Sequence, residues 1–105
     1  MALPRYKLVE TLENSEGTAD ALALLKSLAN MDRLTILCSL IEAEKSVSEL
    51  ENTLGIRQPT LSQQLARLRG DELVSTRRDG KVIYYSIGSD EVEQVIEVLH
   101  DLYCS

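Results

Sequence analysis

Apolar residues recur every three or four positions along most of the chain, the spacing of one helical face. Leu61, Leu65 and Leu68, for example, fall at i, i+4 and i+7, so we expect them to face a core. Between the fifth and sixth helical segments the pattern changes to the alternation typical of strands, with Asp79-Gly80 as a hairpin signal. Helices are predicted at residues 8–15, 18–29, 31–43, 46–54, 58–69 and 89–103, and strands at 73–78 and 81–87.

Polar residues and turn formers mark the ends of these helices. Ser46 and Glu49 have the spacing of a capping box, which would begin the helix at 46–54. Gly55 is suited to end that helix, and Pro59 suits the first position of the next one. Two helices joined by such a tight turn form a helix-turn-helix, and a hairpin directly after it makes a winged helix. A plain helical bundle with an incidental hairpin is the alternative. Further residues able to cap helix starts are Thr18, Asn30 and Ser89.

Composition is that of a globular protein. The 105 residues are 44% hydrophobic and 27% charged, which predicts one domain over residues 1–105. No uncharged apolar run approaches the length that spans a bilayer, and the first residues lack the apolar core of a signal peptide, so we expect a cytoplasmic protein without membrane contact. With neither Trp nor Phe, a large aromatic ligand cage is not expected.

Charge is distributed unevenly. Residues 57–81 contain six basic and three acidic side chains, a local charge of +3, whereas the whole chain carries −6. The remainder therefore carries −9, so only this region could approach a polyanion. The simpler interpretation is a solvated cluster of charges on a polar helix face and a solubilised hairpin.

The polar and basic residues of this region are predicted to form one DNA-contacting surface. With the leucines of residues 58–69 buried, the opposite face of that helix carries glutamine and arginine, which pair with adenine and guanine in the major groove. The tip of the hairpin adds three cations. A winged helix used only for protein contacts is the rival hypothesis. The candidate DNA-contacting residues are Arg57, Gln58, Thr60, Ser62, Gln63, Gln64, Arg67, Arg77, Arg78 and Lys81.

Several segments resemble the ArsR family of bacterial repressors. Residues 24–34 resemble the signature of its second and third helices, and residues 46–50 with 58–69 resemble its DNA-reading helices. Gln64 stands where many members have His, and Asp71-Glu72-Leu73 where Asp-Gly-Leu is usual. The resemblance covers roughly residues 20–104. It implies a mainly α winged helix-turn-helix that forms a homodimer through its first and last helices (residues 1–17 and 89–104), binds an imperfect palindromic operator, and releases it when an inducer binds.

The ligand sets of the metal-sensing members are incomplete in this chain. One such set is a Cys-x-Cys pair on the first DNA-reading helix, but residues 49–53 contain no cysteine. Another uses Asp and His pairs on the last helix, where only Asp90 and His100 occur and Val92 replaces the second His. No cofactor is expected either, and an enzyme is not expected because the chain has one His, no Cys-x-x-Cys and no Gly-rich phosphate loop.

Cys38 and Cys104 resemble the pair of the family's dithiol branch, which senses persulfides and oxidants. Two thiols can be joined by a disulfide or a longer sulfur chain, and in a reducing compartment such a bond is more typical of a sensor than of a structural crosslink. The prediction is a homodimeric repressor released by reactive sulfur species or oxidants. Three alternatives stay open: Cys38 as a small core residue, a metal site of Cys38, His100 and Cys104, and repression without sensing.

Overall fold

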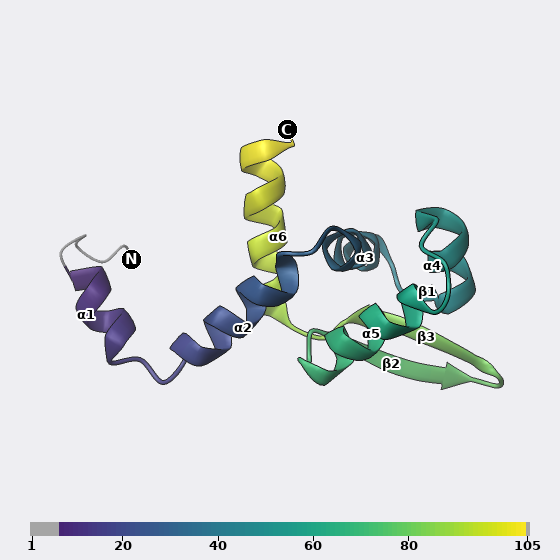
Figure 1. Cartoon of the computed structure of the whole chain (residues 1–105), viewed down its shortest axis with the longest axis horizontal. Helices are drawn as coiled ribbons and strands as arrows, with labels where there is room; N and C mark the ends of the chain where they lie inside the picture. The colour runs from purple at the N-terminus through teal and green to yellow at the C-terminus, as the bar shows by residue number, and fades with distance from the viewer. Residues whose placement is uncertain (1–6, 105) are drawn as a thin grey trace.

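The computed structural model describes residues 7–104, so residue 105 and residues 1–6 of the predicted N-terminal dimerisation segment lie outside the described part. Helices pack around a small sheet, α6 rises from this body, and α1 lies farthest from the sheet, beyond α2 (Figure 1). This is the mainly α winged helix-turn-helix expected from the sequence. The elements are α1 (Leu8–Glu13), α2 (Thr18–Leu28), α3 (Met31–Glu42), β1 (Lys45–Ser46), α4 (Val47–Leu54), α5 (Thr60–Gly70), β2 (Val74–Asp79), β3 (Val82–Ile87) and α6 (Asp90–Tyr103).

The predicted caps are confirmed at three of these helices. The side chain of Asn30 accepts a hydrogen bond from a backbone amide at the start of α3, and Ser89 does the same for α6. At α4 the capping box is complete: Ser46 Oγ accepts from the Glu49 amide at 3.2 Å, and a Glu49 carboxylate oxygen accepts from the Ser46 amide at 3.0 Å. Gly55 ends α4 in the left-handed conformation, with φ 71°. Local sequence therefore sets the ends of the helix-turn-helix.

One expected capping residue and one expected first helical residue were wrong. Gly17, not Thr18, occupies the cap position of α2, and the Thr18 hydroxyl donates instead to the Leu12 carbonyl. Helix α5 begins at Thr60, so Pro59 lies at the cap position, one residue before the helix. Because proline offers no side-chain acceptor, the backbone amides in the first turn of α5 need a hydrogen-bond acceptor from another residue.

The sheet is antiparallel, with strand order β1-β3-β2. Strand β1 has two residues, which is too short for an alternating pattern to reveal it. In the hairpin, Asp79 pairs with Val82, so the turn residues are Gly80 and Lys81 and not the predicted Asp79-Gly80. Gly80 adopts φ 64°, the left-handed conformation that glycine accepts without strain. The shift places Lys81 at the tip of the wing.

A tight turn links α5 to the sheet. Glu72 adopts φ 61° at the position where the ArsR resemblance leads us to expect glycine. The Gly88 amide donates to the Leu73 carbonyl at 3.0 Å, which brings the end of β3 against the start of β2. A Cβ atom on Gly88 would lie 2.8 Å from Ser75 Oγ and 2.9 Å from the Val74 carbonyl carbon, so only glycine fits there.

Helices α3–α6 and the end of α2 share one core with the sheet. The predicted stripe of α5 is confirmed, since Leu61, Leu65 and Leu68 are all buried. In α3 the buried stripe includes Ile36, with Leu37 and Leu40. None of the helices in residues 7–104 is both long and apolar enough to cross a membrane.

The apolar face of α1 and parts of the apolar faces of α2 and α6 lie outside this core. No residue of α1 is buried, and in α2 Leu22 and Leu25 are more than half exposed while Leu28 is buried. Leu102 and Tyr103 at the end of α6 are 69% and 80% exposed. The radius of gyration is 15.7 Å, whereas a compact chain of about 100 residues has roughly 13 Å. The apolar faces of α2 and α6 are therefore only partly covered within one chain.

Candidate functional site

The second helix of the helix-turn-helix, α5, has its orientation fixed by its three buried leucines. Because successive helical residues are about 100° apart, burial of these leucines directs Gln63 away from the core and Gln64 to one side. Gln63 is exposed and Gln64 half-buried. Arg57, Thr60 and Gln63 have exposed side chains with no hydrogen bond to any other residue in the range 7–104. These three groups are available to a partner that approaches α5.

Gln58 and Ser62 cap the start of α5. The Gln58 side-chain oxygen accepts from the Ser62 amide at 3.0 Å and from the Ser62 hydroxyl. This side-chain oxygen replaces the acceptor that Pro59 lacks. Both residues stay predicted DNA contacts, but in the free protein they also hold the N-terminal turn of α5 in place.

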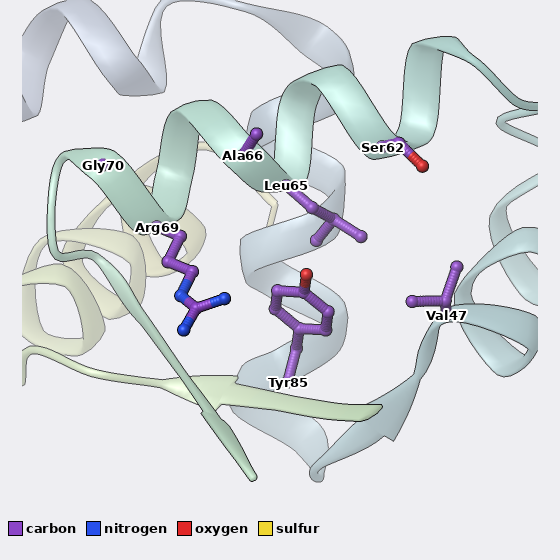
Figure 2. Close-up of a pocket in the computed structure, with 7 residues that line it drawn as sticks. All are labelled: Val47, Ser62, Leu65, Ala66, Arg69, Gly70 and Tyr85. Atoms are coloured by element: carbon purple, nitrogen blue, oxygen red, sulfur yellow. The ribbon is translucent and has the colours of Figure 1, made fainter. Parts of the chain in front are cut away.

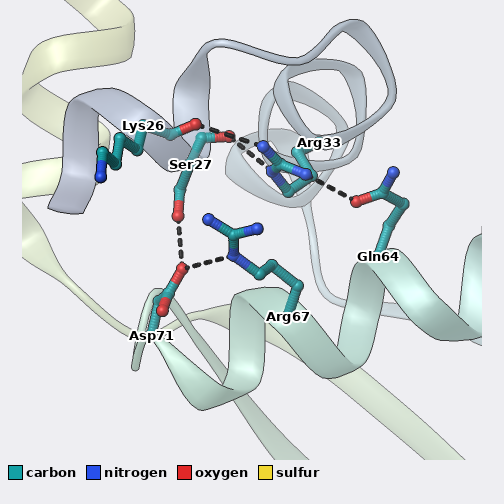
Figure 3. A network of polar contacts seen from close by, with 6 residues as sticks. All are labelled: Lys26, Ser27, Arg33, Gln64, Arg67 and Asp71. Atoms are coloured by element: carbon teal, nitrogen blue, oxygen red, sulfur yellow. Dashed lines mark hydrogen bonds and ion pairs between the residues drawn. The ribbon is translucent and has the colours of Figure 1, made fainter.

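Gln64 is held by Arg33, a residue that the sequence did not single out (Figure 3). The Arg33 guanidinium donates to Gln64 Oε1 at 3.0 Å, to the Ser27 carbonyl at 2.8 Å and to the Lys26 carbonyl at 3.2 Å. One side chain of α3 therefore joins the C-terminal end of α2 to the middle of α5.

Arg67 belongs to a second connection between α2 and α5, also drawn in Figure 3. Asp71, just beyond α5, accepts from the hydroxyl of buried Ser27 at 2.5 Å and from Arg67 Nε at 3.3 Å. The Ser27 hydroxyl, helped by Arg67, holds the pKa of the Asp71 carboxyl below its ordinary value. The charge of Arg67 is thus partly neutralised within the chain, and α5 is tied to α2 at its C-terminal end.

The three predicted cations of the wing differ in whether a carboxylate of the same chain pairs with them. Arg77 Nε and Nη2 donate to the carboxylate of Glu44 over 2.7–2.9 Å, and its guanidinium carbon lies 4.5 Å from the centre of the Tyr84 ring. The Glu44 carboxylate raises the pKa of Arg77. Arg78 and Lys81 are exposed and form no ion pair within residues 7–104. The tip of the wing therefore carries two unpaired cations, and Arg77 joins the wing to the segment after α3.

Both cysteines line one pocket of about 640 Å³ between α3 and α6. They are free and exposed thiols, so the interpretation of Cys38 as a small core residue was wrong. Leu34 and Ile41 of α3 and Ile96 of α6 form its apolar wall, and Glu42 and His100 are also at its edge. The structure thus brings together two residues that lie 66 positions apart in the sequence.

The pocket disfavours the charged form of Cys38. Partial burial raises the pKa of the Cys38 thiol, and the negative charges of Cys104 and Glu42 raise it further. At neutral pH Cys38 is therefore mainly the protonated thiol, the less nucleophilic form.

The metal alternative gains no support from this arrangement. Among residues 7–104, no three His, Cys, Asp or Glu side chains are grouped so as to hold a metal ion. The Nδ1 atom of His100 lies 3.9 Å from the Asp101 carboxylate, and both side chains are mostly exposed.

Comparison with known proteins identifies the family. Residues 30–76 match the family model described as bacterial regulatory protein, arsR family. The chain is 48% identical over 92 residues to the transcriptional activator HlyU of Vibrio cholerae, a match that covers 88% of this chain and 85% of HlyU. The chain belongs to the ArsR family. It is a DNA-binding transcriptional regulator, and its ArsR relatives are regulators rather than enzymes.

Solved structures of similar regulators share the fold. The repressor BigR from Xylella fastidiosa superposes with a TM-score of 0.83 at 37% identity, covering 98% of this chain and 99% of BigR. Reduced HlyU from Vibrio cholerae gives 0.81 at 47% identity, covering 93% and 100%. A homodimeric winged helix-turn-helix DNA-binding domain from Mycobacterium bovis gives 0.74 at 29% identity, covering 85% and 86%. The resemblance to the ArsR family expected from the sequence is confirmed, and the similarity to HlyU and BigR places the chain in their branch of it.

Proposed function

We propose that this regulator is a homodimeric repressor that releases its palindromic operator when Cys38 and Cys104 are bridged on exposure to reactive sulfur species or oxidants. The observation that carries the proposal is the placement of both exposed thiols in one pocket between α3 and α6. A pair of thiols on two different helices can close a bond that changes how those helices pack.

The bridge forms in two exchange steps. One thiolate attacks the sulfane sulfur of a persulfide or polysulfide, takes up that sulfur and displaces the donor's thiolate. The second thiolate then attacks the inner sulfur of the new cysteine persulfide, which gives the Cys38–Cys104 disulfide and expels hydrosulfide. The donor is the oxidant, since its sulfane sulfur leaves as sulfide. Retention of the added sulfur in a trisulfide requires a second equivalent of polysulfide as oxidant.

The exposed apolar faces support a homodimer. Leu8 and Leu12 of α1 and Leu102 and Tyr103 of α6 are at least half exposed, although large apolar patches rarely face water on a monomer. The related Mycobacterium bovis domain is homodimeric. We infer that α1 and α6 pair with a second copy, which sets the distance between the two α5 helices. Two recognition helices can enter successive major grooves only when they are about 34 Å apart.

Helix α3 can transmit a change at Cys38 to both predicted DNA-contacting elements. Arg33, near its start, holds Gln64 of α5, and Glu44, just beyond its end, holds Arg77 of the wing. Cys38 lies between these two contacts. A bridge that moves α3 against α6 therefore acts on α5, on the wing and on the dimer contact of α6. A coupling of about 2–3 kcal/mol changes DNA affinity tens- to over a hundredfold.

The test measures operator affinity before and after polysulfide treatment. The operator is first selected from a random duplex pool, and affinity is then followed by fluorescence anisotropy for the parent, Cys38→Ser and Cys104→Ser. We expect the parent to lose affinity on treatment and regain it with dithiothreitol, and both serine variants to keep full affinity throughout. Loss of DNA binding by either treated serine variant would refute the bridge.

A further inference from the structure

A second pocket lies between α5 and the sheet, on the opposite flank of α5 from Arg33 and Asp71. Its volume is about 380 Å³. Figure 2 shows Arg69 and Ser62 reaching it from α5 and Tyr85 rising toward α5 from β3. Leu65 of the core forms its floor, and Val47 and Tyr85 pack against the same core, whereas the polar side chains of Ser62 and Arg69 have no part in that packing.

Helix geometry assembles one wall of this pocket. Ser62, Ala66 and Arg69 occupy i, i+4 and i+7, so they share one flank of α5. The small side chain of Ala66 leaves the space open. The opposite wall is Tyr85, whose position in β3 is fixed by pairing with Thr76 on β2 and with β1.

The chemistry of the pocket suits an anion. Arg69 is exposed and, unlike Arg67 and Arg77, has no carboxylate partner within residues 7–104. The Tyr85 hydroxyl has no hydrogen-bond partner in the same part of the chain, and no acidic residue lines the pocket. An arginine fork with a nearby hydroxyl donor matches the oxygens of a phosphate.

The position of the pocket indicates which phosphate it takes. When α5 lies in a major groove and the wing reaches the neighbouring minor groove, one DNA backbone strand must pass between them. We propose that the pocket between α5 and β3 binds a phosphodiester of that strand, with the Arg69 guanidinium on the phosphate oxygens and the Tyr85 hydroxyl donating to one of them. Such contacts fix the register of a protein on DNA without specifying sequence. The proposal rests on DNA binding by α5 and the wing and is independent of the thiol bridge.

The first test is the salt dependence of binding by Arg69→Gln. Two 30-bp duplexes serve as probes, one containing the selected operator and one of random sequence, and Lys26→Gln, which removes an exposed cation of α2, is the matched control. Each lost phosphate contact lowers the slope of log affinity against log salt by about 0.9. We expect this change per protomer for Arg69→Gln, with the same fold loss of affinity on both duplexes, and no change for Lys26→Gln. An unchanged slope, or a loss confined to the operator, would overturn the phosphate contact.

The second test locates the phosphate and separates contact from folding. Single methylphosphonates that remove one backbone charge are placed along the operator. The parent should lose affinity when one particular phosphate of each half-site is replaced, and Arg69→Gln should be insensitive to that replacement. Tyr85→Phe should show a smaller loss of sensitivity at the same phosphate. Thermal unfolding of both variants should stay as in the parent. Equal sensitivity of parent and Arg69→Gln at every phosphate contradicts the proposal. If the parent binds neither duplex, DNA recognition itself is refuted, a result distinct from failure of this contact.

Discussion

Arg33→Ala tests the connection that orients α5. The substitution removes hydrogen bonds to Gln64 Oε1 and to the Ser27 carbonyl, both partly buried, and an exposed one to the Lys26 carbonyl. A hydrogen bond contributes about 0.5–1.5 kcal/mol net, so the two partly buried ones amount to about 2 kcal/mol and the exposed one adds little. For a domain of this size that corresponds to a fall in Tm of about 8–16 °C.

The assay is thermal unfolding followed by circular dichroism at one fixed protein concentration, because the stability of a dimer depends on concentration. Arg57→Ala is the matched control, since it removes an exposed arginine without an intramolecular partner in residues 7–104 and should change stability by less than about 0.5 kcal/mol. Gln64→Ala removes only one of the three bonds and should fall between the two. If Arg33→Ala unfolds within 2 °C or so of Arg57→Ala, Arg33 does not hold α5.

Three further perturbations test other parts of the account. Gly88→Ala should destabilise the protein by about 1–3 kcal/mol in urea unfolding, because its Cβ meets backbone. The pKa of Asp71 is lowered in the folded state. The carboxylate therefore stabilises the fold fully at pH values above its ordinary pKa of about 3.9, and this stabilisation is lost as pH falls through the lower folded pKa. Ser27→Ala should weaken that acid dependence of unfolding. The pKa of Cys38 is raised, so its alkylation by iodoacetamide, measured in Cys104→Ser, should remain slow at neutral pH and accelerate through the alkaline range, and Glu42→Gln should make it faster at pH 7.5.

Each of these has a clear contrary result. Parent-like stability of Gly88→Ala would mean that β2 and β3 separate without cost at that point. Identical acid unfolding of parent and Ser27→Ala would show that the Ser27 hydroxyl does not stabilise the carboxylate. Alkylation of Cys38 that is unaffected by Glu42→Gln would remove this acid as a cause of its low reactivity.

The sequence predicts those parts of the fold that depend on neighbours along the chain. The capping box of Ser46 and Glu49 and the buried stripe of α5 need only residues three or four positions apart. The two errors at helix starts and the one-residue shift of the hairpin also involve local signals. In each case two adjacent residues could occupy the cap or turn position, and the sequence did not decide between them. Strand β1 carries no signal of its own because it forms only by pairing with β3.

The polar contacts of the candidate site are long-range and were not predictable. Arg33 lies 31 positions from Gln64, and Glu44 lies 33 positions from Arg77, so no local spacing relates them. The sequence alone therefore predicts Arg77 and Arg78 as equally available to DNA, although of the two only Arg78 has no carboxylate partner in residues 7–104. The pairing of the cysteines came from family resemblance, and the structure adds the shared pocket.

The most direct test of the bridge is mass spectrometry of the protein that is released from DNA. Operator-bound protein on beads is treated with polysulfide, the released and retained fractions are digested without reduction, and peptides containing Cys38 and Cys104 are analysed by mass spectrometry. We expect the released fraction to contain the two peptides joined through a disulfide or a longer sulfur chain, and the retained fraction to contain both as free thiols. Release of protein with both thiols unmodified, or equal bridging in the retained fraction, would contradict thiol-controlled DNA release.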